Sequence, residues 1–102
     1  KMTYDVCHAK LHCNHDKISL AEYTKKVMPL VSHLHISDAK GIDGEGIQIG
    51  DGNIDFDTLF DIIEKSKNND YTWVTEIWSG HLNQGTGCRK SMHNLKKYNK
   101  II

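Results

Sequence analysis

The sequence lacks paired cysteines and long apolar runs. Its three cysteines, Cys7, Cys13 and Cys88, have neither the C-x-x-C spacing of a structural zinc site nor the dense, even set of a disulfide framework. We therefore expect reduced thiols in a cytoplasmic protein. No apolar run approaches the ~18–20 residues that span a bilayer, and the N-terminus has no signal-peptide pattern. A membrane is therefore not an expected partner.

An excess of charge is also missing. The 102 residues hold 13 basic and 13 acidic side chains, and no basic stripe favours contact with phosphates, so nucleic acid is an unlikely partner. The length allows one small domain, residues 1–102. The chain begins with Lys1 rather than Met and enters a strand pattern almost at once. This favours a piece cut from a longer protein.

What the sequence has is an alternation of strand and helix patterns. Strands are expected at 2–8, 31–37 and 71–78, and helices at 20–28, from Asp55 onward, and at 88–98. This order predicts an α/β fold of three consecutive parallel βα units joined by right-handed crossovers. Three units cannot close an eight-stranded barrel, but they can form the C-terminal portion of a (β/α)8 TIM barrel.

Local signals set several of these boundaries. Ser19 to Glu22 is a capping box, and the single proline, Pro29, ends the helix that follows. Asp55 is a good N-cap for the next helix. The segment 9–17 is polar, and the segment 40–53 is rich in glycine, so both are expected to be loops.

The stretch from Val31 to Phe56 organises the chain. Side chains alternate across a strand, so His33 and His35 share one face while Leu34 and Ile36 share the other. This is the pattern of a barrel strand with a site at its C-terminal mouth. A half-exposed antiparallel strand with solvated histidines explains the same pattern equally well.

Carboxylate and imidazole groups gather where the expected strands end. The groups are Asp5 and His8, then His35 and Asp38, then Glu76 and His81. Oxygen and nitrogen ligands from separate strand ends can hold a divalent ion, with Mn, Mg, Co and Zn all open. Each residue alone has a simpler explanation, such as a strand-end cap for Asp5 or a hydrogen-bonded core histidine for His33. Glu76 is the hardest to dismiss, because a carboxylate within an aromatic and β-branched run is costly to bury unpaired.

Several motifs together resemble a known family. They are Asp5-x-x-His8, His33-x-His35-x-x-Asp38, Gly44-Glu45-Gly46, Gly50-Asp51-Gly52-Asn53-Ile54-Asp55-Phe56, and Glu76 in the third strand. On these motifs nearly the whole chain resembles the C-terminal part of the xylose isomerase-like TIM barrel superfamily. That group includes sugar and sugar-phosphate isomerases and epimerases, and endonuclease IV. The resemblance implies that the three strands are the sixth, seventh and eighth of the barrel.

The resemblance also implies roles for single residues. It implies Asp5, His35 and Glu76 as ligands of a divalent metal ion, with Glu76 also a catalytic acid/base group. His8, Asp38 and His81 are then expected to contact the substrate. A further glutamate ligand that the family places on an earlier strand has no counterpart here. An arginine that the epimerases carry is replaced by Gly41.

The expected function is therefore part of a metal-dependent sugar or sugar-phosphate isomerase or epimerase. Such an enzyme moves a proton between adjacent carbons through a metal-stabilised enediolate. The alternatives are an endonuclease IV-like nuclease, which the neutral charge disfavours, and a sugar-binding barrel without catalysis. The incomplete ligand set predicts that the isolated chain is inactive. Its unpaired strand edges predict pairing with the remainder of the barrel or with a second copy.

Overall fold

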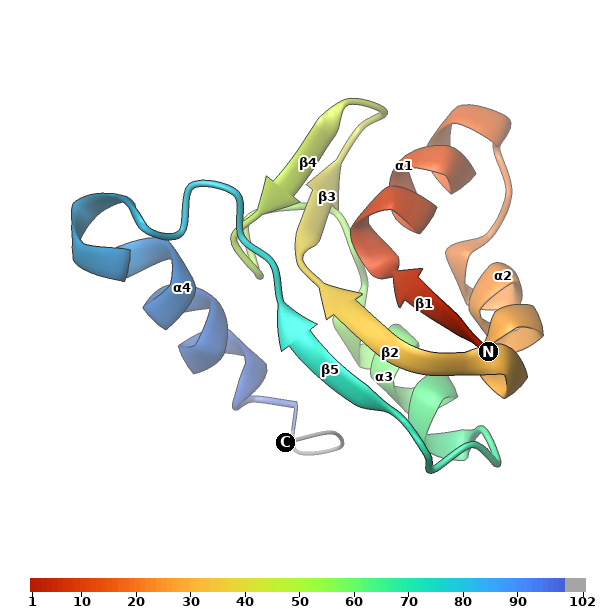
Figure 1. Ribbon diagram of the computed structural model, residues 1–102. Coiled ribbons are helices and arrows are strands. Elements are labelled where there is room, and N and C mark those ends of the chain that lie inside the picture. The colour runs from red at the N-terminus through yellow and green to blue at the C-terminus, as the bar shows by residue number, and fades with distance from the viewer. Residues whose placement is uncertain (99–102) are drawn as a thin grey trace.

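The computed structural model describes residues 1–98 and contains a parallel three-stranded sheet. Its strands are β1 (Met2–Asp5), β2 (Val31–Ile36) and β5 (Thr72–Thr75), in the order β1-β2-β5. Figure 1 shows β2 between the other two, with all three arrows pointing the same way. The parallel pairing expected from the sequence is confirmed, although each strand is shorter than its pattern suggested. Among the described residues, β1 and β5 each pair with β2 alone in this sheet.

The connections between the strands carry the helices. Helices α1 (Val6–Asp16) and α2 (Leu20–Val27) and a short 3-10 turn, η1 (Met28–Leu30), lead from β1 to β2. An antiparallel hairpin of β3 (Asp38–Lys40) and β4 (Gly44–Ile47), followed by α3 (Phe56–Lys65), leads from β2 to β5. Helix α4 (Leu82–Leu95) follows β5. The fold is therefore a mixed α/β arrangement around a parallel sheet, as a partial barrel requires.

The expected loop at 9–17 is wrong, because most of it belongs to α1. The strand ends at Asp5, whose side chain caps the helix by accepting the backbone N–H of His8 at 3.0 Å. The helix ends at Lys17 in the left-handed region, with φ 57°. Its buried residues include two cysteines among histidines, so the sequence shows little of the apolar stripe that marks a helix.

The expected loop at 40–53 is partly wrong, because β3 and β4 occupy its first half. Gly41 makes the turn with φ +65°, a conformation that L side chains rarely adopt. Glycines in a strand weaken its sequence signal, which explains why Gly44-Glu45-Gly46 reads as loop. The hairpin rises beyond the C-terminal end of β2 and lies near α1 (Figure 1).

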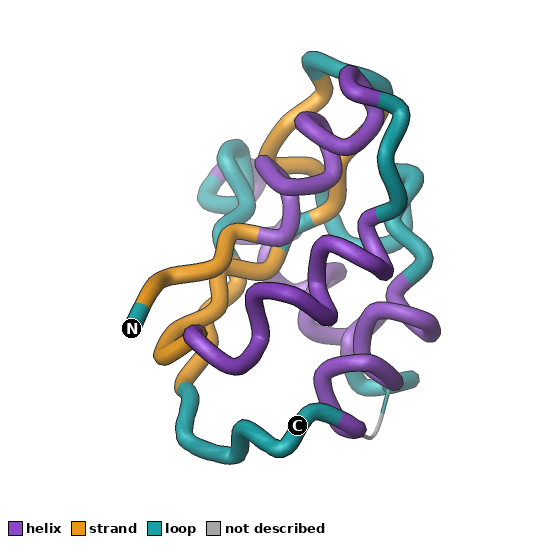
Figure 2. Tube along the Cα trace, turned by 90° about the vertical axis from the view of Figure 1, so that its right-hand side faces the viewer, coloured by secondary structure: helices purple, strands orange, loops and turns teal. Residues whose placement is uncertain are grey.

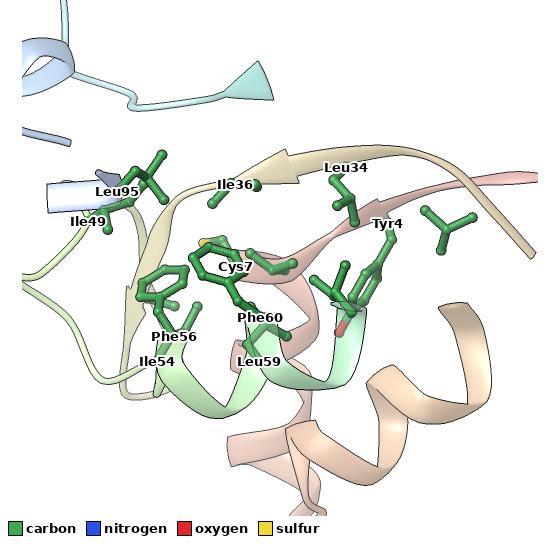
Figure 3. Packing of buried hydrophobic residues seen from close by; sticks show 14 of the residues in the cluster. Tyr4, Cys7, Leu34, Ile36, Ile49, Ile54, Phe56, Leu59, Phe60 and Leu95 are labelled. Atoms are coloured by element: carbon green, nitrogen blue, oxygen red, sulfur yellow. The ribbon is translucent and has the colours of Figure 1, made fainter. Parts of the chain in front are cut away.

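The core lies between the sheet and the helices. Figure 2 shows the helices gathered mainly on one side of the strands. Leu34 and Ile36 point to this side and are fully buried, as their alternation predicts. They meet the apolar stripe of α3, in which Phe56 and Phe60 lie 5.4 Å apart between ring centroids (Figure 3). The apolar stripe of α3 is buried in full: Phe56, Leu59, Phe60 and Ile63.

One residue of β2 departs from simple alternation. Strict alternation would put Val31 on the face of His33 and His35, but Val31 belongs to the buried cluster. The register shifts between Met2 and Thr3, which pair with Val31 and His33. An irregularity of this kind inserts one residue on one strand and so changes the face on which the preceding side chain lies. On the face opposite the helices, the first polar side chain of β2 is therefore that of His33.

The helix boundaries read from capping residues are close to the observed ones. Ser19 accepts the backbone N–H of Glu22 at the start of α2, and Asp55 accepts that of Thr58 at the start of α3. Pro29 lies in the 3-10 turn that ends the α2 segment. Helix α4 begins earlier than expected, but residues 83–85 within it have positive φ, so the regular helix starts after them. No helix within residues 1–98 is long and apolar enough to cross a membrane.

Candidate metal centre

Asp5 stands at the junction of β1 and α1, which fixes both of its oxygens. Oδ1 accepts the backbone N–H of His8 at 3.0 Å. Oδ2 lies 2.9 Å from Nδ1 of the His8 ring. The side chain is 22% exposed, so it can still be reached from solvent. The chain therefore turns His8 back toward Asp5.

His35 occupies the central strand, between the strand that ends at Asp5 and the strand that precedes Glu76. In the sheet register it pairs with Asp5 on one side and with Val74 on the other. Its Nδ1 lies 3.0 Å from Oε2 of Glu76 and 3.8 Å from Oδ2 of Asp5. The ring of His33 meets it edge-on, with 5.2 Å between centroids. The polar face of β2 is therefore directed at the two neighbouring strand ends.

Glu76 follows β5 directly. Its backbone N–H donates to the carbonyl of Ile36 at 3.1 Å, so the pairing of β2 with β5 continues up to this residue. Its side chain is 49% exposed. The argument that burial would force this carboxylate to find a partner is therefore wrong. The outer face of β5 is open, and what remains in favour of Glu76 is its geometry.

These three residues form a compact group at the C-terminal end of the sheet. One ligand atom from each of Asp5, His35 and Glu76 lies within 4.8 Å of the others. Two carboxylate oxygens and one imidazole nitrogen form a donor set that suits Mn, Co and Zn, and less ideally Mg. The residues present therefore fit a divalent ion, and their convergence at one end of the parallel sheet is as the sequence predicted.

His8 bridges two carboxylates beside this group. Its Nδ1 faces Asp5, and its Nε2 lies 2.8 Å from Oε2 of Glu45 on β4. A carboxylate can only accept, so each ring nitrogen must carry a proton to satisfy both contacts. The hydrogen bond to Glu45 accordingly raises the pKa of His8, and the nearby Asp5 raises it further. Glu45 was not among the site residues expected from the sequence, where it appeared only as part of a family motif.

Asp38 lies apart from the group and is almost completely buried. Its oxygens accept four backbone N–H groups at 2.9–3.0 Å, those of Ala39, Gly50, Gly52 and Ile54. These bonds fold the glycine-rich loop back over the carboxylate. They give Asp38 a structural task, and its contact with a substrate stays a prediction.

His81 is exposed at the start of α4 and is not a member of the group. A shallow groove of about 300 Å³ lies nearby, between residues 45–48 of the hairpin and residues 77–79 after β5. Trp78 is 57% exposed there, and its backbone N–H donates to the carbonyl of Gly46. The groove thus lies between the hairpin and the segment that follows Glu76.

Comparisons with known proteins identify the family of the chain. An uncharacterized protein of Methanocaldococcus jannaschii is 31% identical over 104 residues, which cover 99% of this chain and 32% of that protein. The chain thus spans about a third of the length of the curated relative it matches. No solved structure matches the chain. The family model described as xylose isomerase-like TIM barrel matches residues 1–98, and the chain belongs to that family.

Proposed function

We propose that this chain forms the last three βα units of a TIM barrel and carries part of the active site of a metal-dependent sugar or sugar-phosphate isomerase or epimerase. In this proposal β1, β2 and β5 are the sixth, seventh and eighth strands. The observation that carries it is the convergence of Asp5, His35 and Glu76 within 4.8 Å at the C-terminal ends of three parallel strands. In TIM barrels this end of the sheet is where active sites lie.

Each residue would have a defined task. Asp5, His35 and Glu76 would hold a divalent ion, which when bound acts as a Lewis acid on neighbouring oxygens of the sugar. Glu76, with its exposed carboxylate, would take a proton from one carbon or return it to the adjacent one. His8, whose two ring nitrogens face Asp5 and Glu45, would orient the carboxylate of Asp5 beside the sugar. The groove between the hairpin and the segment after β5 offers a sugar both polar groups, on Glu45 and Ser79, and the indole of Trp78.

The rest of the barrel would complete the site. The outer strands β1 and β5 pair only with β2 within the described sheet. Both can therefore add further strands, either from the remainder of a longer chain or from a second copy. We propose that a strand added beside β1 brings the further acid/base glutamate that the family uses.

The test is proton exchange in the intact protein. With Mn²⁺ and candidate aldoses, ketoses and their phosphates in D₂O, the wild type should incorporate deuterium at the carbon next to the carbonyl. Glu76→Gln should lower the exchange rate by about 100-fold or more, because it removes the charge and the exchangeable proton while the side-chain volume barely changes. Its unfolding transition should stay close to that of the wild type.

Glu22→Gln is the matched control, since it makes the same change on the exposed surface of α2, where Glu22 pairs with Lys25. It should leave exchange unchanged. An unchanged rate in Glu76→Gln would refute the acid/base role. Sugar binding without any exchange in the wild type would point to a barrel that binds sugar without catalysis.

A further inference from the structure

We propose that Glu45 is a positioning residue of this site, which fixes the ring of His8 and, through it, the carboxylate of Asp5. The inference rests on the proposed function, because it concerns the same metal group. It adds a residue from the β3–β4 hairpin, an element outside the parallel sheet. Glu45 contacts His8, which in turn contacts the ligand residue Asp5.

The contacts form a continuous chain. Nε2 of His8 is hydrogen-bonded to Oε2 of Glu45 at 2.8 Å, and Nδ1 of the same ring forms an ion pair with Oδ2 of Asp5 at 2.9 Å. That oxygen of Asp5 is also the one that faces Nδ1 of His35. An imidazole held at one nitrogen can still swing about its side-chain bonds. Held at both, it has one orientation, and the oxygen of Asp5 that it contacts is oriented with it.

The hairpin is a firm support for Glu45. The backbone N–H of the next residue, Gly46, donates to Sγ of Cys7 at 3.3 Å. The carbonyl of Gly46 accepts from the backbone of Trp78 at 3.1 Å. At the turn, the side chain of Asn14 donates to the carbonyl of Gly41 at 2.7 Å. The hairpin is thus tied to α1 on one side and to the segment after β5 on the other.

A direct ligand role for Glu45 is the competing explanation. The group whose ligand atoms lie within 4.8 Å of one another consists of Asp5, His35 and Glu76. Glu45 is outside it and is paired with His8 instead. The two roles make different predictions when His8 is removed.

A double-mutant cycle on Mn²⁺ affinity in the intact protein separates them. Glu45→Ala should weaken Mn²⁺ binding roughly tenfold or more, the usual effect of losing an outer partner of a ligand. Glu45→Gln should weaken it less, because its amide oxygen still accepts from His8. In a His8→Ala background, Glu45→Ala should cause no further loss. Equal losses of Mn²⁺ affinity in the wild-type and His8→Ala backgrounds would overturn the proposal. Glu45 would then bind the metal directly or act through its charge alone.

Asp43→Asn is the matched control, since it removes a carboxylate from the turn of the same hairpin. It should leave Mn²⁺ affinity within twofold of the wild type. A loss as large as that of Glu45→Ala would also overturn the proposal.

A second measurement keeps this inference separate from the proposed function. In the metal-free protein, the ¹⁵N chemical shifts of the His8 ring should move in Glu45→Ala and stay in place in Asp43→Asn. A wild type that binds no Mn²⁺ would refute the proposed function, while shifted His8 signals would still support the tie between Glu45 and His8. Unmoved His8 signals in Glu45→Ala would overturn the proposal whether or not metal binds.

Discussion

Replacing Asp38 with Asn should destabilise the fold more than it disturbs substrate binding. Asp38 is 1% exposed, and its two oxygens accept two backbone N–H groups each. An amide keeps only one oxygen, so whichever way it turns, its NH₂ group faces two backbone donors that have lost their acceptor. A buried donor without a partner costs about 1–3 kcal/mol. We therefore expect the free energy of unfolding to fall by about 3 kcal/mol, with an upper limit near twice that value.

Urea denaturation of the intact protein measures this loss. Asp51→Asn is the matched control, because Asp51 lies in the same loop but makes an exposed ion pair with Lys90 at 3.2 Å. Such a pair contributes at most about 1 kcal/mol. If Asp38→Asn is as stable as the control and instead raises KM for a sugar, then the structural explanation is wrong and the substrate contact implied by the family resemblance is right.

Other substitutions test the hairpin, the core and a helix cap. Gly41→Ala should cost about 1–2 kcal/mol for its positive φ alone, because nothing lies within 4 Å of the added Cβ. Gly46→Ala should cost more, since its Cβ would also lie 2.3 Å from the neighbouring indole; equal losses in urea denaturation would contradict that clash. Phe60→Ala, at a fully buried site in α3, should lower the free energy of unfolding by about 3–5 kcal/mol, and a loss under about 1 kcal/mol would contradict the described packing. Hydrogen bonds from the Thr58 side chain and backbone lower the pKa of Asp55 in the folded state. The stability that Asp55 adds over Asp55→Asn should therefore be present above about pH 4 and be lost as the pH falls below it, and a difference independent of pH between 2 and 6 would contradict this role of the carboxylate.

The parts of the fold that the sequence predicted are those with local signals. The capping residues Ser19 and Asp55 marked the starts of α2 and α3. The alternation of Leu34 and Ile36 with histidines identified the buried and polar faces of β2. Each of these signals lies within a few residues of the feature that it predicts, so no knowledge of tertiary contacts was needed.

The parts that it missed depend on contacts distant in sequence. Helix α1 buries cysteines and few aliphatic side chains, so its helical period is weak and its burial comes from packing against other elements. Whether Asp38 faces a substrate or its own loop depends on how the glycines after β4 fold back. Glu45 meets a histidine that lies 37 residues earlier, and only the hairpin brings them together.

The convergence of Asp5, His35 and Glu76 was predicted correctly for a simple topological reason. Parallel strands carry their C-terminal ends to one edge of a sheet, so Asp5, His35 and Glu76 had to meet if the three strands paired in parallel. Their roles as ligands, and that of Glu76 as an acid/base group, stay predictions until metal and substrate are tested. The openness of the outer face of β5 could not be read from the pattern, because the alternation does not say what covers a face.

The central place of β2 has a consequence for the order of folding. The β3–β4 hairpin joins neighbours in the chain, and such hairpins form within about 1–10 μs. The parallel pairs β1–β2 and β2–β5 each need a long crossover connection. The conformational entropy of that connection is lost before the strands make stabilising contacts. Asp5, His35 and Glu76 come together only when both pairs exist. Glu45 can therefore be on a formed hairpin while the group of Asp5, His35 and Glu76 is still unassembled, because that group needs both parallel pairs.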